Sequence, residues 1–240
     1  MPSTYLSPGV YVEEVPSASA PIAGVGTSTA GFIGVKGSQT SSESETTETE
    51  TLAQNPLTAT EEVKLCTNFG EFKKFFGDFS EDTNQNILAH AVYGFFRNGG
   101  TRCYVVQIDS EDNIDSALNE FEAIDEIAIV AAPGIISGRD KIKDHCANSG
   151  DRFAILDSVE EVDLSNAAQV KGLKPFDSDY AALYFPWIKV FDPATKQQIY
   201  VPPSGHMAGI YARVDKHRRL IKKQNNESVL GAEGLQLNNS

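Results

Sequence analysis

Two glycines, Gly26 and Gly31, have the spacing of a phosphate-binding loop. Such a loop needs a lysine to reach the phosphate oxygens and a hydroxyl to hold Mg²⁺, but Phe32 and Ile33 stand at these two positions. A dinucleotide fingerprint that starts at Gly24 fails as well, because its third glycine is missing. The sequence therefore predicts no nucleotide site and no cofactor.

Candidate nucleophiles and bases are equally isolated. Ser204 precedes His206 without the glycines of a nucleophile elbow, and its place before an apolar-periodic stretch predicts a helix N-cap. Asp157 follows an apolar strand, where open α/β sheets carry ligands, but a turn or cap role is the stronger interpretation for a lone carboxylate. His145 and Cys146 are adjacent, so their side chains diverge on a helix. We expect no catalytic residues and no enzyme.

The three cysteines, Cys66, Cys103 and Cys146, show no CxxC or Cys-His spacing. An odd number of cysteines without ligand spacing indicates buried thiols, because free cysteine behaves as a small hydrophobe. We therefore expect neither a disulfide framework nor a metal site.

Charge excludes one class of partner and suggests another. A formal net charge of −13 argues against nucleic acid and anionic membrane, since phosphate binding depends on lysine and arginine. One segment is basic nevertheless, and either a solvated helix face or a docking patch for an acidic partner explains it. The partner could be the glutamates of 43–50 in a neighbouring copy or a different protein. The patch consists of Arg213, Lys216, Arg218, Arg219, Lys222 and Lys223.

No stretch of the sequence approaches the ~20 apolar residues that a bilayer span needs, and the N-terminus lacks the pattern of a signal peptide. The sequence thus predicts synthesis in the cytoplasm and no direct membrane insertion.

The elements between these residues alternate in type. Near-continuous apolar strands separated by amphipathic helices predict an α/β fold with a mixed, mostly parallel sheet flanked by helices. We expect helices from Asn68 to Gly77, over 84–98, 114–121 and 140–147, and from Ser204 onward; we expect strands over 103–108, 127–132 and 153–156, a pair at 180–187 and 188–191, and a strand at 198–201.

The N-terminal part differs from this domain. Four prolines within residues 1–22 exclude a helix, and Val10-Tyr11-Val12-Glu13-Glu14-Val15 has strand composition without a hairpin partner. An unpaired strand is marginal alone, so this one is expected to pair with the sheet edge of a neighbour.

These patterns predict five regions. They are an extended arm (1–22), a glycine-rich lead-in strand (23–36), an acidic Ser/Thr/Glu-rich mobile loop (37–61), an α/β domain (62–215) and a C-terminal stretch (216–240).

The ordered motifs of the chain resemble the tail sheath proteins of contractile phages and of phage-derived extracellular injection systems. The motifs are YLSPGVYVEEV (5–15), GVGTSTAGFIG (24–34), FGEFKKFFGDF (69–79), LAHAVYGFFRNGGTRCYVVQI (88–108), IAIVAAPGI (127–135), GDRFAILD (150–157), YAALYFPWIKVFDP (180–193) and VPPSGHMAGIYARVD (201–215). After Asp215 the chain departs from the family's usual sequence, and the resemblance implies that 216–240 is the start of an incomplete C-terminal domain, truncated or missing in this chain. We therefore expect either a fragment or a short form.

The resemblance implies a structural subunit. Such subunits form hexameric rings that stack helically around an inner tube, and contraction drives the tube through a target envelope. The implied partners are other copies of the chain, the inner tube protein, and baseplate and terminal cap proteins; the implied setting is a phage tail or an extracellular particle. Two alternatives stay open: a short sheath paralogue or accessory assembly protein of the same particle, and a soluble α/β ligand-binding domain or enzyme.

Overall fold

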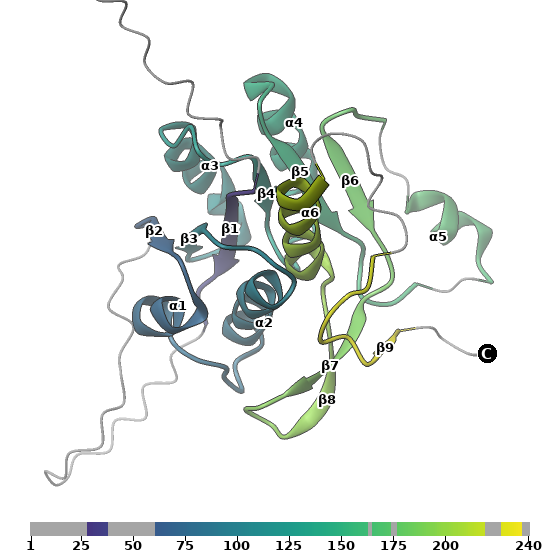
Figure 1. Cartoon of the computed structure of the whole chain (residues 1–240). Coiled ribbons are helices and arrows are strands. Elements are labelled where there is room, and N and C mark those ends of the chain that lie inside the picture. Colours follow the sequence, from purple (N-terminus) through teal and green to yellow (C-terminus); the bar gives the residue numbers. More distant parts are fainter. Residues whose placement is uncertain (1–27, 38–60, 163–164, 174–176, 219–226, 237–240) are drawn as a thin grey trace, which may run out of the picture.

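The computed structural model describes residues 28–37, 61–162, 165–173, 177–218 and 227–236. In these ranges a six-stranded sheet lies between two layers of helices (Figure 1). The strands follow the order β2-β3-β1-β4-β5-β6, and only β2 runs antiparallel to its neighbour. Their bounds are β1 Ala30–Val35, β2 Lys64–Cys66, β3 Cys103–Ile108, β4 Ile129–Ala131, β5 Phe153–Asp157 and β6 Ala181–Tyr184. The predicted mixed, mostly parallel sheet is confirmed.

Strand β1 lies inside the sheet, with β3 and β4 in parallel on its two sides. Its side chains alternate between the two faces, so that Phe32 joins one apolar core and Ile33 the other. A Cβ atom at Gly31 would lie 2.7 Å from the Phe121 ring, so this glycine lets a helix approach the sheet closely. At this position the glycine-rich motif therefore allows α3 to pack closely against β1, and this packing explains Gly31 without a bound phosphate.

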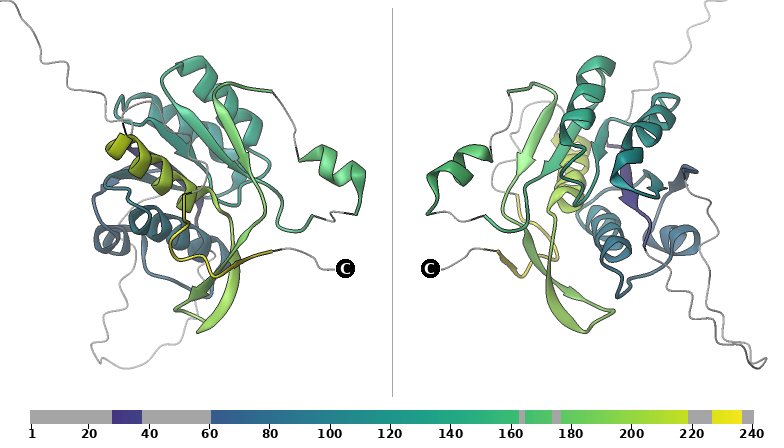
Figure 2. Two further views of the ribbon diagram at one scale, coloured as in Figure 1. Left: turned by 45° about the vertical axis from the view of Figure 1, so that its right-hand side comes forward. Right: turned by 180° about the vertical axis from the view of Figure 1, so that it is seen from behind.

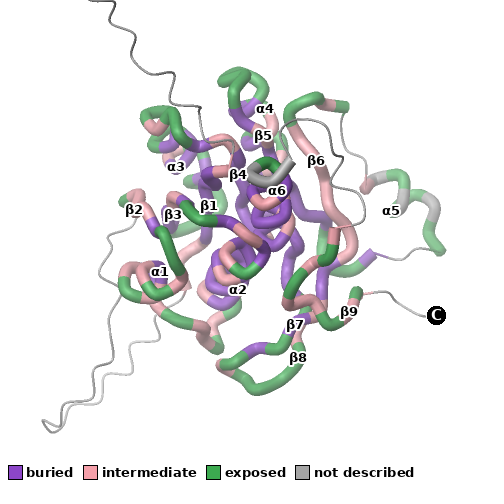
Figure 3. Tube along the Cα trace, viewed as in Figure 1, coloured by how far each residue is buried: buried purple, intermediate pink, exposed green. Residues whose placement is uncertain are grey.

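Helices cover both faces of the sheet (Figure 2). One face carries α1 (Phe69–Phe76), α2 (Thr83–Arg97) and α6 (Ser204–Arg218), and the other carries α3 (Ile114–Glu122) and α4 (Arg139–Ser149). A short 3₁₀ helix (Glu111–Asn113) precedes α3, and α5 (Ala167–Gly172) lies beyond β6. Buried residues follow the strands and the inner sides of these helices (Figure 3). We call the six-stranded sheet with its helices the body.

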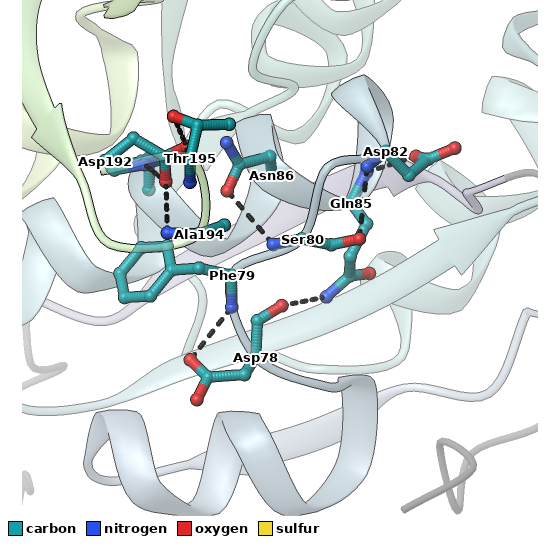
Figure 4. Close-up of polar contacts among 10 residues, drawn as sticks. Asp78, Phe79, Ser80, Asp82, Gln85, Asn86, Asp192, Ala194 and Thr195 are labelled. Atoms are coloured by element: carbon teal, nitrogen blue, oxygen red, sulfur yellow. Dashed lines mark hydrogen bonds and ion pairs between the residues drawn. The ribbon is translucent and has the colours of Figure 1, made fainter. Parts of the chain in front are cut away.

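Local signals explain where the first two helices begin and end. The Asn68 side chain accepts a hydrogen bond from the Glu71 N–H, and Gly77 ends α1 with a φ of 99° that favours glycine. Asp82 caps α2 in the same way, through the Gln85 N–H at 3.0 Å (Figure 4). Both predicted helices are confirmed.

Helix α6 crosses α2 at close range through glycines. A Cβ atom at Gly205 would lie 2.4 Å from the Ala91 backbone, and one at Gly209 would lie 2.4 Å from the Phe95 carbonyl oxygen. Real side chains do not tolerate such distances from a backbone. The SGHMAG motif thus joins two helices that are far apart in the sequence.

The start of α6 corrects one prediction. Ser204 does not cap the helix but is its first residue, because the Met207 N–H already bonds to the Pro203 carbonyl. Its own N–H and hydroxyl donate to Asp157 at 2.8 and 2.6 Å. Asp157, at the end of β5, therefore caps α6 across the fold, which confirms the cap interpretation for this carboxylate.

A second sheet extends from the body (Figure 1). It contains β7 (Ile188–Asp192), β8 (Gln197–Val201) and β9 (Gly234–Leu235) in the antiparallel order β8-β7-β9, and we call it the small sheet. Both strands predicted at 180–187 and 188–191 are present, but they lie in different sheets, since β6 pairs with β5 and β7 pairs with β8. Pro186 has no N–H for a ladder, so the first strand ends at Tyr184 and the chain changes sheet.

Candidate subunit interface

The predicted interface strand lies outside the described residues. That strand consists of Val10, Tyr11, Val12, Glu13, Glu14 and Val15. Three residues of the predicted docking patch also lie outside the described residues, namely Arg219, Lys222 and Lys223. Lys216 and Arg218 belong to α6, but their side chains are not described. Arg213 is the member of the patch whose contacts are described.

Arg213 binds within the chain. Its guanidinium lies 3.5 Å from the Glu227 carboxylate and donates to the Ser228 carbonyl at 3.1 Å. Its aliphatic part lies against Gly99, where a Cβ atom would come within 2.8 Å of the Arg213 Cβ. This arginine therefore fastens the segment before β9 to α6.

The small sheet has one covered and one open face. Residues opposite each other in the β7–β8 ladder point to the same face of the sheet. On the face toward the body, Ile188, Val190 and Val201 are buried. The next pairs, Lys189 with Tyr200 and Phe191 with Gln198, turn outward. Phe191 is 52% exposed and Tyr200 is 37% exposed. An aromatic surface is thus left open on a projecting element.

Exposed apolar side chains gather in this region. The large apolar side chains that are exposed among the described residues are Val159, Tyr180, Phe191, Tyr200, Leu230 and Leu235. Four of these belong to the small sheet or to the segment that leads into β9. Contiguous apolar surface on a soluble domain marks contact with another molecule more often than scattered single residues do.

A buried polar pair attaches the small sheet to the body. His90 Nε2 of α2 lies 3.1 Å from Asp192 Oδ1 at the end of β7, and both side chains are almost fully buried. Asp192 also accepts hydrogen bonds from the Ala194 N–H, the Thr195 N–H and the Thr195 hydroxyl (Figure 4). These donors outweigh burial and hold the pKa of Asp192 at about 2, so His90 Nε2 donates to a carboxylate. Burial lowers the pKa of His90, which keeps its ring neutral near pH 7.

Two further contacts hold the same junction. The Trp187 indole N–H donates to the Ser158 carbonyl at 3.0 Å, at the point where the chain leaves the body. The Asn98 side chain, at the end of α2, accepts from the Leu230 N–H and donates to the Leu230 carbonyl. Each attachment uses buried or half-buried groups, so the small sheet is docked on α2 in a defined position.

A cavity of about 330 Å³ opens beside this junction. Its lining comes from α2, α6, β7, the loop before α2 and the segment 231–233, and includes Phe79, Tyr93, Arg97, Phe191, His206 and Glu233. We call it the junction cavity. It brings residues together that sequence reasoning did not connect, because they come from five segments and share no motif.

The other residues singled out for chemistry have structural contacts. Burial raises the pKa of Asp157 to about 7 against the hydrogen bonds it accepts from Ser204 and Gly134. Ring nitrogen Nε2 of His145 lies 3.2 Å from an Arg152 nitrogen, while Cys146 packs in the core under α4, so the two side chains diverge as predicted.

The three thiols are free and buried. Burial raises the pKa of Cys66 and of Cys146 to about 12 and that of Cys103 well above its usual value, so none is a reactive thiolate. Within the described ranges no three His, Cys, Asp or Glu side chains come together as metal ligands. No helix in the part of the chain that the structure describes has the length and apolar character to cross a bilayer.

Comparison with known proteins adds structures of similar fold. No protein-family model matches the sequence, and no curated protein matches it. The structure is similar to the sheath complex of an extracellular contractile injection system, PVC, in the contracted state, with 25% identity and a TM-score of 0.66. That match covers 98% of this chain and 57% of the PVC chain. The chain has the fold of a contractile sheath protein.

Two more sheath-system structures have the same fold. The helical sheath of the anti-feeding prophage in the contracted state is 22% identical, with a TM-score of 0.65 over 98% of this chain and 59% of the other. A chain of the baseplate of that particle in the contracted state is 17% identical, with a TM-score of 0.67 over 96% and 60%. The chain thus spans about three fifths of the length of the proteins whose structures it matches. The resemblance predicted from the motifs is confirmed.

Proposed function

We propose that the chain is a structural subunit of a contractile sheath, which polymerises as stacked rings around an inner tube and contracts to drive the tube through a target envelope. The observation that carries the proposal is the sheath fold over 98% of the chain, shared with sheath complexes of two injection systems. The role is mechanical and non-enzymatic. The open aromatic face of the small sheet supports it, since a ring subunit needs surface for its neighbours.

The coupling between copies belongs to the proposal too. The segment Val10–Val15 of one copy would add as a strand to a sheet edge of a neighbour, where backbone hydrogen bonds fix the register. Within the described residues β8 pairs with β7 alone, so its outer edge offers unpaired N–H and C=O groups. The linker between Pro16 and Pro21 would let the joined bodies rotate while the strand stays attached.

The other partners are an inner tube protein and baseplate and terminal cap proteins. Lys216, Arg218, Arg219, Lys222 and Lys223 would form the docking patch for an acidic surface, while Arg213 stays bound to Glu227. The particle would be assembled in a bacterial cytoplasm and act as a phage tail or an extracellular injection particle. Charge reversal at Arg218 and Arg219 should weaken assembly, and unchanged assembly would remove the patch from the proposal.

A second candidate is a short sheath paralogue at the baseplate end of the same particle. The observation that favours it is the match to chains of the baseplate structures, with TM-scores of 0.60 and 0.67. The two candidates differ in copy number, which mass spectrometry of purified particles would count. Many copies per particle support the sheath subunit, and a single ring supports the paralogue.

The test of the proposed function is removal of residues 1–20. We expect sheaths to disappear in electron micrographs while circular dichroism shows the α/β domain intact. A matched single substitution is Val12→Pro, which removes one ladder N–H, compared with Val12→Thr, which keeps it. Normal sheaths formed by the deletion variant would contradict the arm mechanism.

A further inference from the structure

Two of the three free thiols lie opposite each other at one edge of the large sheet. Cys66 of β2 pairs with Cys103 of β3 in the antiparallel ladder, so both side chains point to the same face. Both are fully buried, and both belong to the apolar core under α1 and α2. Cys146 lies in the core on the other face of the sheet. The fold therefore places two thiols together and leaves the third alone.

The register brings Cys66 and Cys103 within the range of a disulfide. Opposite residues of an antiparallel pair have Cα atoms about 4.5 or 5.5 Å apart, depending on the hydrogen-bonding pattern at that position. A disulfide needs a Cα separation of about 4.4–6.8 Å, so either kind of pair permits the bond with little backbone movement. No local spacing in the sequence indicates the pair, because the folded sheet makes the contact.

The closed sheet protects both thiols from oxidation. Burial raises the pKa of Cys66 to about 12 and that of Cys103 well above its usual value, and the charge of Glu71 adds to both shifts. The thiolate is the form that attacks a disulfide, so neither cysteine reacts while β2 is in place. Oxidation of the pair requires β2 to leave the sheet for a moment.

Strand β2 is built to open more readily than the inner strands. It has three residues, and among the described residues it pairs with β3 alone. Its first two residues, Lys64 and Leu65, are only partly buried. Segments with few buried contacts open at a lower free energy than the core of a domain. Opening of β2 exposes Cys66 and uncovers the edge of β3 that carries Cys103.

We propose that Cys66 and Cys103 form a thiol–disulfide pair, which closes when β2 opens in the presence of a small-molecule disulfide such as oxidised glutathione. The Cys66 thiolate attacks one sulfur of that disulfide and releases one small thiol. The Cys103 thiolate then attacks the Cys66 sulfur and releases the second. The two protein thiols lose two electrons and two protons, and the small disulfide gains them. The inference goes beyond the proposed function and does not depend on it.

The bond would strengthen the part of the body on which the small sheet is docked. It closes the segment 66–103, which contains α1 and α2, and α2 supplies His90 to the contact with Asp192. A cross-link across such a segment restricts the unfolded chain and stabilises the folded one. Cytoplasmic thiols stay reduced, whereas disulfides persist outside cells, so the bond would form after the protein leaves the cell.

The first test oxidises the full, unchanged chain with a mixture of reduced and oxidised glutathione. We expect it to lose the mass of two hydrogen atoms, and we expect the tryptic peptides 65–73 and 103–139 to be linked until a reductant is added. Cys146 should remain open to alkylation after unfolding. Three free thiols, a link that includes Cys146, or glutathione adducts without a link would overturn the proposal.

Urea unfolding gives the matched comparison. Oxidation should raise the urea midpoint of the unchanged chain and of Cys146→Ala, because both keep the pair. It should leave the midpoints of Cys66→Ala and Cys103→Ala unchanged. A rise in either of these two variants, or no rise in Cys146→Ala, would contradict the assignment of the pair.

The second test addresses the opening of β2. Glycine weakens a strand, so Lys64→Gly should speed oxidation at low oxidant concentration by roughly two- to fivefold. Lys189→Gly is the matched control, because Lys189 lies in β7 of the small sheet. Mass spectrometry of acid-quenched samples measures both rates. Equal rates for the two variants, or oxidation no faster than global unfolding, would show that opening of β2 does not admit the oxidant.

Discussion

The sheet of the body and the small sheet differ in how many of their faces are covered. The large sheet is covered by helices on both faces, and the side chains of β1, β3, β4 and β5 are almost all buried. The small sheet covers one face and leaves Phe191 and Tyr200 exposed on the other. Under the proposed function, the covered sheet would keep the shape of the subunit while the open sheet would offer surface to neighbouring subunits.

The largest expected difference between the two sheets is the loss of stability when one phenylalanine in each is truncated to alanine. Phe32 is fully buried in β1 and meets the Phe95 ring edge to face at 5.4 Å, so Phe32→Ala should cost about 3–5 kcal/mol of unfolding free energy. Phe191→Ala should cost less than about 1 kcal/mol, since half of the ring is already exposed. Urea unfolding followed by circular dichroism measures both. Equal losses would show that the small sheet is as much a part of the core as β1.

The next largest effect concerns the link between the two sheets. Asp192→Ala leaves His90, two N–H groups and the Thr195 hydroxyl without their shared acceptor, and should cost about 3 kcal/mol. Hydrogen exchange should speed up in β7 and β8 before it does in β1 and β3. Asp115→Ala is the control, because Asp115 pairs with Lys141 at an exposed site and should change stability little. Uniform acceleration across both sheets would argue against a separate junction.

Protonation of His206 at acidic pH should lower the free energy of unfolding. Its pKa is about 4 in the folded chain and near its usual 6.5 in the unfolded chain, so the unfolded state binds the proton more readily. The stability that neutral His206 contributes is complete above about pH 6.5 and declines as the pH falls, by roughly 2 kcal/mol at pH 5.

Asp157 acts in the other direction, because its pKa is raised to about 7 and protonation favours the folded chain. The measurement is therefore the difference in unfolding free energy between the unchanged chain and His206→Gln across pH 7 to 5. That difference should shrink toward acid. A constant difference would mean that His206 does not titrate in this range.

The smallest expected effect lies at the segment that carries β9. Arg213→Gln removes a partly buried pair with Glu227 and should cost about 1 kcal/mol or less, with faster proteolysis around residues 227–236 as its clearer sign. Arg102→Gln, at a more exposed pair, should leave that segment unchanged. If both variants are cleaved alike, Arg213 does not hold the segment.

Local and periodic signals predicted most of the body. The apolar run at 103–108 became β3, and the repeat of Leu88, Val92 and Phe95 became the buried side of α2. Strand β2 was missed because three residues carry no periodicity, and its antiparallel pairing with β3 is a long-range contact. Such a pairing depends on which backbone N–H and C=O groups remain unpaired at the edge of the folded sheet.

The candidate interface was harder to predict than the fold. The cap of α6 is Asp157, 47 residues away, so the local rule that favoured Ser204 named the wrong residue. The junction cavity joins α2, β7, α6 and segment 231–233, and no spacing in the sequence links Phe79 with Glu233. His90 and His206 were the sequence signal for this region, because both histidines fall on apolar helix faces. A buried polar ring on such a face indicates a specific contact.

The position of β1 bears on how force would pass through the subunit. It is the first strand after residue 27, and it is hydrogen-bonded in parallel to β3 over six residues and to β4 over three. Tension that enters along its axis must shear both ladders at once, whereas tension across an edge strand peels bonds one after another. If neighbours pull on the N-terminal arm during contraction, the load arrives at a strand that is held by a parallel ladder on each side.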